Sequence, residues 1–121
     1  MAIAPGPAGP QRVLRCACVD IGTNTTRLLV ADRTPGGLRT VVVARAFVSL
    51  GTQALAAGAV AGTTATLCAA VAGHLAIARR HDVDVIRVVG TAALRAADDP
   101  DALCAAIRAA AGTEVEILTP R

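Results

Sequence analysis

Two apolar runs flank three turn-forming residues near the start of the chain, and this pattern limits the choice of folds. The first run extends from Val13 to Ile21 and stops at Gly22-Thr23-Asn24, and the second extends from Thr25 to Asp32. Turn residues between two strand-like runs predict a β-hairpin. Thr34-Pro-Gly-Gly37 predicts a second turn, before a Val-rich run from Leu38 to Val48. We therefore expect three antiparallel strands.

The periodicity then changes to that of a helix. Apolar residues recur three or four positions apart from about Thr63, at Leu67, Val71, Leu75 and Ala78. A shorter helical turn is expected around Gln53 to Ala57. The run from Val83 to Val89 is almost continuously apolar and β-branched, which is typical of a buried parallel strand.

The last third of the chain predicts a capped helix and a short strand. Asp99 can cap the helix, Pro100 suits its first position, and Gly112 suits its end. Glu114 to Leu118 is the last predicted strand. The order βββαβαβ, with right-handed helical crossovers, predicts one α/β domain over residues 13–119 with a mixed sheet. Residues 1–12, rich in Pro and Gly, are expected to be a disordered leader.

Composition disfavours several classes of function. Phe47 is the only aromatic residue and the twelve basic residues, all arginine, are scattered, so neither base stacking nor a basic stripe for nucleic acid is expected. The most apolar later stretch, Leu67 to Ala78, is too short to span a membrane, and the start of the chain does not resemble a secretory signal. A cytoplasmic protein is expected. The four cysteines lack metal-site spacing and no disulfide is expected, and Cys16 and Cys18, on one face of a strand, are predicted to be small buried apolar residues.

The segment from Asp20 to Arg27 is the best candidate for chemistry. A carboxylate at the end of a buried strand, as at Asp20, can hold a divalent cation or orient water. Gly22 would allow a positive φ and close approach of a ligand. The hydroxyl and amide groups of Thr23, Asn24 and Thr25 could then surround a phosphate. An ordinary hairpin turn also favours these residue types, so the residues leave both interpretations open.

Three segments resemble one family. The stretch DIGTNTTRLLVAD, Asp20 to Asp32, is similar to the first phosphate hairpin of the exopolyphosphatase/guanosine-pentaphosphate phosphohydrolase (Ppx/GppA) family. That family lies within the actin, Hsp70 and sugar-kinase ATPase superfamily. VVGTAALRAADD, Val88 to Asp99, and GTEVEILT, Gly112 to Thr119, resemble two later family segments in the same order. Asn24 and Arg95 favour this family over other superfamily members, such as a sugar kinase or a cell-division ATPase.

The resemblance implies the N-terminal lobe of a phosphoanhydride hydrolase, with a ribonuclease H-like (actin-like ATPase) fold. It would bind the terminal phosphates of polyphosphate or guanosine pentaphosphate together with Mg²⁺, and it leaves a homodimer open. The expected metal ligand is Asp20. The expected phosphate-binding residues are Gly22, Thr23, Asn24, Thr25 and Arg95, with Arg95 facing the same cleft as Asp20 and Arg108 on the outer face of the last helix.

The sequence also departs from the family. Ser49 precedes Leu50-Gly51 where the family usually has Arg, and Ala92 and Ala96 replace a Ser and an Asp. Each change removes a polar group that would face the phosphate cleft, so substrate affinity or metal binding is expected to differ from that of the family. The family's catalytic glutamate loop, Gly-x-Glu-Glu-Ala, follows the strand that corresponds to Glu114 to Leu118, where this sequence has Thr119-Pro-Arg121. The second phosphate loop lies further on. We therefore expect no catalytic residue within these 121 residues and no second lobe.

Other titratable residues have structural interpretations. Glu114 and Glu116 suit the solvated face of an edge strand, whereas Asp98, Asp99 and Asp101 suit helix capping. His74 and His81 are expected to pack against or cap their helix. Two functions follow: a phosphate-binding lobe of an enzyme that needs further residues for hydrolysis, or a non-catalytic phosphate-binding or interaction remnant of the same family.

Overall fold

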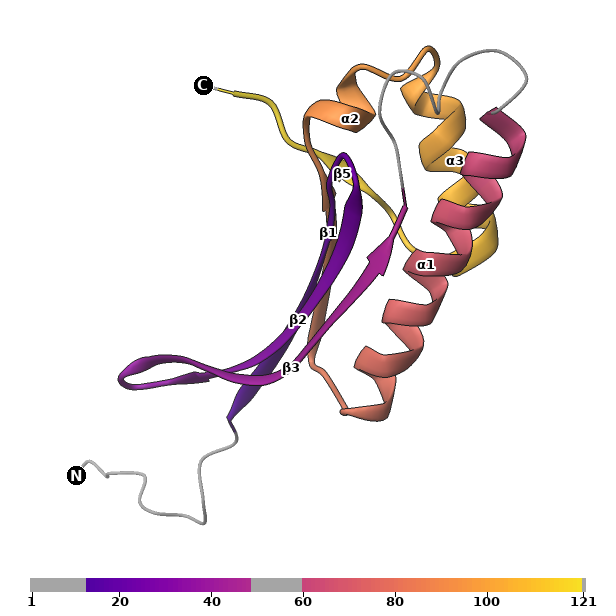
Figure 1. Cartoon of the computed structure of the whole chain (residues 1–121). Coiled ribbons are helices and arrows are strands. Elements are labelled where there is room, and N and C mark those ends of the chain that lie inside the picture. Colours follow the sequence, from indigo (N-terminus) through magenta and orange to yellow (C-terminus); the bar gives the residue numbers. More distant parts are fainter. Residues whose placement is uncertain (1–12, 49–59, 121) are drawn as a thin grey trace, which may run out of the picture.

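The computed structural model describes residues 13–48 and 60–120. The predicted leader, the predicted helical turn at Gln53 to Ala57, and the Ser49 departure lie outside these residues. The described elements follow the order β1, β2, β3, α1, β4, α2, α3, β5 along the chain (Figure 1). In the described residues no helix is both long and apolar enough to cross a membrane.

The predicted antiparallel meander is confirmed. Strand β1 spans Leu14–Ile21, β2 spans Thr25–Thr34 and β3 spans Gly37–Phe47. β1 and β2 pair so that Ile21 lies opposite Thr26 across the first turn. Both β2 and β3 extend towards the second turn beyond the predicted bounds, because Thr34 still pairs with Gly37 and its hydroxyl donates to the Gly37 carbonyl at 2.9 Å.

The second half of the chain supplies the helices and the parallel strands. α1 spans Val60–Arg80, β4 spans Val85–Gly90, α3 spans Pro100–Ala111 and β5 spans Glu116–Ile117. Asp99 caps α3 by accepting a hydrogen bond from the Ala102 amide at 3.0 Å, and Gly112 ends it in the left-handed region, as predicted.

Two predicted boundaries and one omission need correction. β5 has two residues rather than five, because only Glu116 and Ile117 pair with β4. β4 begins at Val85, two residues later than predicted. A short helix, α2, spans Ala92–Arg95 and was not predicted, because four residues are too few to show a helical repeat of apolar positions.

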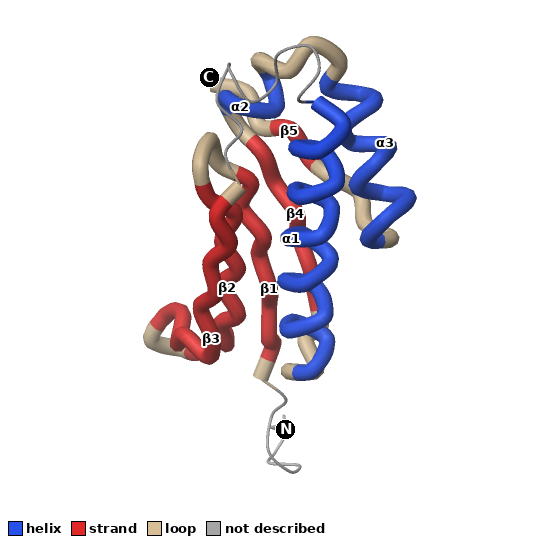
Figure 2. The backbone as a smooth tube through the Cα atoms, turned by 45° about the vertical axis from the view of Figure 1, so that its right-hand side comes forward, coloured by secondary structure: helices blue, strands red, loops and turns tan. Residues whose placement is uncertain are grey.

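The five strands form one mixed sheet in the order β3-β2-β1-β4-β5, in which β1, β4 and β5 are parallel. Helices α1 and α3 lie side by side against one face of the sheet (Figures 1 and 2). Alternate β1 residues, Ala17, Val19 and Ile21, are buried on this face. They meet the apolar stripe of α1, which contains Leu67, Val71, Leu75 and Ala78, all with no exposed surface. Burying each large apolar side chain contributes ~1.5–3 kcal/mol.

No described element covers the opposite face of the sheet, which we call the open face. The strand register puts five exposed apolar side chains on it: Leu14, Leu29, Val43, Phe47 and Val85. The prediction of a fully buried β4 is therefore wrong, because β4 has helices on one face only. Cys16 and Cys18 also lie on the open face and are half-buried rather than buried. Burial raises the pKa of the Cys18 thiol, which disfavours its thiolate.

Candidate phosphate-binding site

The turn between β1 and β2 is held by backbone hydrogen bonds. The Gly22 amide donates to the Thr25 carbonyl at 3.0 Å, and the Val48 amide donates to the Asn24 carbonyl at 2.9 Å. The side chains of Thr23 and Asn24 are exposed, and Thr25 is half-buried. The turn therefore keeps its shape through the main chain and leaves polar side chains available to a ligand.

Gly22 is needed for close approach rather than for its φ angle. Among the described residues, positive-φ glycines are Gly37 and Gly112, so the predicted positive φ at Gly22 is wrong. A Cβ atom at Gly22 would lie 3.1 Å from the Thr25 carbonyl oxygen, which is closer than nearly all real Cβ contacts. The glycine is therefore explained by the hydrogen bond that closes the turn.

Asp20 lies near the end of β1, is exposed, and points to the open face, away from the helices. Its neighbours in the ladder are Arg27 on β2 and Val89 on β4. It forms no ion pair with any residue that the structure describes. Its carboxylate is thus open to solvent, two residues before the turn.

The register aligns a row of charged side chains with Asp20 across the open face. Glu116, Val89, Asp20, Arg27 and Arg45 occupy successive positions on β5, β4, β1, β2 and β3. Arg27 and Arg45 stand directly opposite each other, and like charges in that position destabilise a sheet. Sequence reasoning missed both arginines, although the pairing of Asp20 with Arg27 follows from counting outward from a hairpin turn at residues 22–25.

Arg95 lies at the end of α2, which follows β4. Because β1 and β4 are parallel and Ile21 lies beside Gly90, the turn and α2 leave the sheet at the same end. The Arg95 guanidinium is exposed and donates one hydrogen bond to the Leu118 carbonyl. The placement of α2 agrees with the expected site, whereas a shared cleft with Asp20 stays a prediction. The control residue Arg108 pairs with Glu114 at 3.3 Å and is exposed.

Gly90 allows α2 to pack at this end of the sheet. A Cβ atom there would lie 2.1 Å from Cδ1 of Leu94, whose side chain has no exposed surface. The Leu118 amide also donates to the Gly90 carbonyl at 2.8 Å. Gly90 therefore sets the distance between the end of β4 and the helix that carries Arg95.

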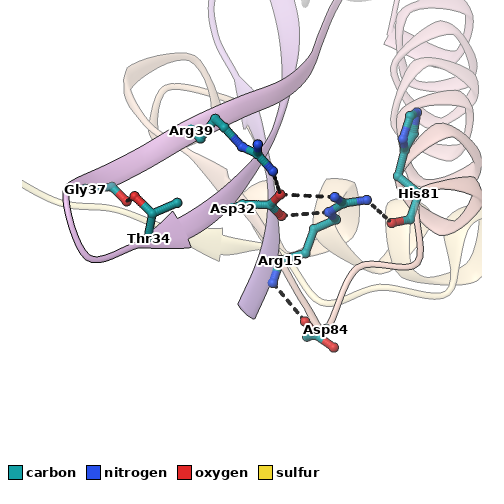
Figure 3. A network of polar contacts seen from close by, with 7 residues as sticks. All are labelled: Arg15, Asp32, Thr34, Gly37, Arg39, His81 and Asp84. Carbon is teal, nitrogen blue, oxygen red and sulfur yellow. Dashed lines mark hydrogen bonds and ion pairs between the residues drawn. The ribbon is translucent and has the colours of Figure 1, made fainter. Parts of the chain in front are cut away.

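Two other carboxylates, those of Asp32 and Glu116, form ion pairs within the protein. Asp32 accepts from Arg15 at 2.7 Å and from Arg39 at 3.0 Å, at the opposite end of the sheet (Figure 3). Hydrogen bonds from these two guanidinium groups lower the pKa of Asp32 to about 2. Glu116 pairs with Arg87, as expected for a solvated edge strand.

Metal-binding groups do not cluster in the described part of the chain, where no three His, Cys, Asp or Glu side chains come together. Asp20 could therefore supply a single protein ligand. A cavity of about 410 Å³ lies elsewhere, beside β4 and the segment that leads into β5, and none of the predicted site residues lines it.

The comparisons with known proteins concern the family and the fold. The model of the Ppx/GppA phosphatase family matches residues 29–121. A solved Ppx/GppA family member from Aquifex aeolicus superimposes with a TM-score of 0.81 at 24% identity, over 90% of this chain and 36% of that one. An exopolyphosphatase from Cytophaga hutchinsonii gives 0.78 at 24%, over 87% and 34%. A search of curated proteins gave no match.

At this identity the likeness establishes the fold. It confirms the predicted α/β class, with a mixed sheet and helices arranged as in the solved Ppx/GppA structures. The chain spans about a third of the length of the solved structures that it matches.

Proposed function

Because the chain belongs to the Ppx/GppA phosphatase family, we propose that it binds the terminal phosphates of polyphosphate or guanosine pentaphosphate at the turn between β1 and β2. The observation that carries this proposal is the turn itself. Its main chain is closed by its own hydrogen bonds, and the Thr23, Asn24 and Asp20 side chains around it are exposed. Folding has therefore already fixed the turn before a ligand arrives, which lowers the ordering cost of binding.

Positive charge near the turn suits an anionic ligand. Arg27 and Arg45 repel each other across the open face, and a phosphate between them would relieve that repulsion. Arg95 still has N–H groups beyond the one that it donates to Leu118, because a guanidinium carries five. These three arginines are the groups that we expect to neutralise phosphate oxygens.

Mg²⁺ fits this chemistry. Mg²⁺ commonly takes one or two carboxylates and completes its shell with water and substrate phosphates. Asp20 is exposed and forms no ion pair with the described residues, so it could supply such a carboxylate. The described residues hold no cluster of metal-binding side chains that could surround the ion on their own. When bound, the ion would neutralise charge on the phosphates. The carboxylate of Asp20 would hold it near the turn.

We further propose that these 121 residues do not hydrolyse the anhydride by themselves. Hydrolysis needs a positioned base for the attacking water, and such a base is typically worth ~10²–10⁴-fold. Asp32, Asp99, Glu114 and Glu116 are engaged in ion pairs or a cap. Asp20 would be committed to the cation. The required base would be the glutamate that follows the strand corresponding to β5 in the family.

A non-catalytic phosphate-binding role is the second candidate. Ala92 and Ala96 support it, because both stand where the family usually has polar residues and both are exposed beside Arg95. Both candidates require phosphate at the turn. The two candidate functions differ in whether further residues, outside these 121, would complete a site that hydrolyses the anhydride.

The test is a titration of the ¹⁵N-labelled chain with a short polyphosphate, with and without Mg²⁺. We expect amide shifts concentrated at Gly22, Thr23, Asn24 and Thr25, and no release of inorganic phosphate. Arg95→Ala should weaken binding about tenfold, which corresponds to ~1.4 kcal/mol and is typical of a charge-assisted hydrogen bond.

Arg108→Ala is the matched control and should change affinity much less, because Arg108 pairs with Glu114. Equal losses in the two variants, or shifts spread evenly over the arginines, would show only nonspecific charge attraction. Robust phosphate release that disappears in Asp20→Ala would refute the proposal of inactivity.

A further inference from the structure

A polar pair is buried between the sheet and α1, directly beneath the phosphate turn. Nε2 of His74 on α1 lies 2.9 Å from Oγ1 of Thr26 and 3.3 Å from the Thr26 carbonyl oxygen. His74 is 3% exposed and Thr26 is 0% exposed. Both are thus removed from water, inside a layer otherwise formed by residues such as Val71 and Leu75.

Packing by itself does not require polar groups here. The neighbouring positions on the same faces are apolar, and an apolar pair could fill this space. A buried hydroxyl or imidazole that lacks its partner costs ~1–3 kcal/mol, so each group depends on the other. The hydrogen bond therefore fixes where Thr26 lies relative to His74, whereas a purely apolar contact would allow the two side chains to shift.

Thr26 is the residue through which this contact can act on the turn. It pairs with Ile21 and so closes the hairpin at the point where residues 22–25 leave the ladder. Its neighbour Thr25 accepts the hydrogen bond from the Gly22 amide. His74 touches both the side chain and the main chain of Thr26, and thereby holds one leg of the turn against the rigid helix α1.

The protonation state suits a fixed contact. A carbonyl oxygen only accepts hydrogen bonds, so the Thr26 carbonyl calls for a proton on Nε2. Burial lowers the pKa of His74, and the hydrogen bond to Thr26 only partly opposes this effect. The ring is therefore neutral near neutral pH, and with its proton assigned to Nε2 it donates to the Thr26 carbonyl and contacts the Thr26 hydroxyl.

We propose that His74 is a positioning residue that sets the geometry of the phosphate turn through Thr26. The expected effect of His74 on polyphosphate affinity rests on the proposed function. The expected effect of His74 on the geometry of the turn does not depend on any ligand, so the two effects can be tested separately.

The experiment uses the full chain and four variants. Thr26→Val removes the hydroxyl at nearly constant shape, Thr26→Ser keeps it, His74→Leu removes the imidazole, and His74→Gln keeps a side-chain amide that can donate. His81→Gln is the matched control, because His81 follows α1 at the far end of the sheet. Amide hydrogen exchange is measured on the ligand-free protein, and affinity is measured with a short polyphosphate and Mg²⁺.

We expect Thr26→Val and His74→Leu to speed exchange of the Gly22 amide and to weaken polyphosphate binding about 2–10-fold, the factor that corresponds to one net hydrogen bond. Thr26→Ser, His74→Gln and His81→Gln should stay near the parent. The double variant Thr26→Val/His74→Leu should lose no more than the larger single loss, because both changes remove one contact.

Three outcomes decide between the alternatives. Unchanged exchange at Gly22 in a folded Thr26→Val variant would overturn the inference. Uniformly faster exchange throughout the sheet would also overturn it, since it would indicate only global destabilisation. Faster exchange at Gly22 in a chain that does not bind polyphosphate would uphold the positioning role and reject the proposed function.

Discussion

The two ends of the sheet place an aspartate of the same hairpin in opposite surroundings. At the turn end, where β1, β4 and β5 finish, Asp20 is exposed and has no ion pair with the described residues. At the ion-pair end, Asp32 is 2% exposed and binds both Arg15 and Arg39 (Figure 3). Arg15 also donates to the His81 carbonyl at 3.0 Å, which ties the hairpin to the end of α1.

We infer from this difference that one end of the hairpin contributes to stability, whereas the other end is the one proposed to bind a ligand. At the ion-pair end, the Asp32 carboxylate is paired with Arg15 and Arg39, so little of its charge is left for a ligand. At the turn end the main chain makes the structural hydrogen bonds, and the charges of Asp20, Arg27 and Arg45 remain exposed. Both ends contain aspartate and arginine, so residue type does not explain the difference. The explanation is which partners the fold brings next to each aspartate.

Replacing each of the two aspartates by asparagine, in separate variants, tests this difference between the two ends most strongly. Asp32→Asn should lower the urea midpoint more than any other change described here, because two guanidinium groups lose a buried carboxylate. Asp20→Asn should leave stability within about 0.5 kcal/mol of the parent, as is usual for a surface substitution. In the binding assay the order should reverse, with the Mg²⁺-dependent part lost in Asp20→Asn.

Urea unfolding and the polyphosphate titration on the same two proteins provide the check. If Asp20→Asn proved as destabilising as Asp32→Asn, the turn end would be a structural site, and the comparison between the ends would fail.

Gly90→Ala probes how tightly the turn end is packed. The added methyl would collide with buried Leu94, and we expect a loss of ~1–3 kcal/mol, as for other overpacked cores. It should also displace Arg95 and weaken polyphosphate binding.

Gly73→Ala on α1 is the control. A Cβ atom at Gly73 would have no atom within 4 Å, so this change should stabilise the helix by about 0.5–1 kcal/mol. Thermal unfolding of both variants measures the contrast. A stable Gly90→Ala protein with normal binding would mean that α2 can move freely without affecting the site.

Acid should weaken the ion-pair end selectively, and this effect is confined to low pH. The pKa of Asp32 is about 2 in the folded protein, against 3.8 for an ordinary aspartate. The unfolded chain therefore binds the extra proton first. The stability contributed by ionised Asp32 is complete above pH 3.8 and is lost as pH falls from 3.8 to about 2.

The stability difference between the parent and Asp32→Asn should accordingly shrink across that window. Urea unfolding at successive pH values measures it. A difference that stays constant down to pH 2 would show that shape, rather than charge, explains the role of Asp32.

Much of the local structure could be predicted because its causes lie within a few residues. The hairpin follows from two apolar runs around Gly22-Thr23-Asn24, and α3 follows from Asp99, Pro100 and Gly112. Those signals depend on φ preferences and on hydrogen bonds between near neighbours. The family resemblance belongs here too, since its three segments are stretches of sequence.

Local signals failed where a neighbouring layer decides the outcome. A nearly continuous run of Val and Ile around β4, interrupted by Asp84 and Arg87, predicts burial on both faces, but helices cover only one, so Val85 is 41% exposed. α2 is a single turn, too short to show a helical repeat of apolar residues, and its place depends on the packing of its own Leu94 against Gly90. Gly22 was assigned a positive φ from its type, whereas the approach of the Thr25 carbonyl explains it.

The sequence by itself determined the elements other than α2, the turn at residues 22–25 and the identity of its polar groups. Only the tertiary structure decided which distant residues meet. Arg15 and His81 are 66 positions apart, Thr26 and His74 are 48 apart, and the row from Glu116 to Arg45 crosses all five strands. These contacts arise because β4 crosses over to lie beside β1 while α1 covers one face. That arrangement is selected by the burial of the whole apolar layer, which no short stretch of sequence contains.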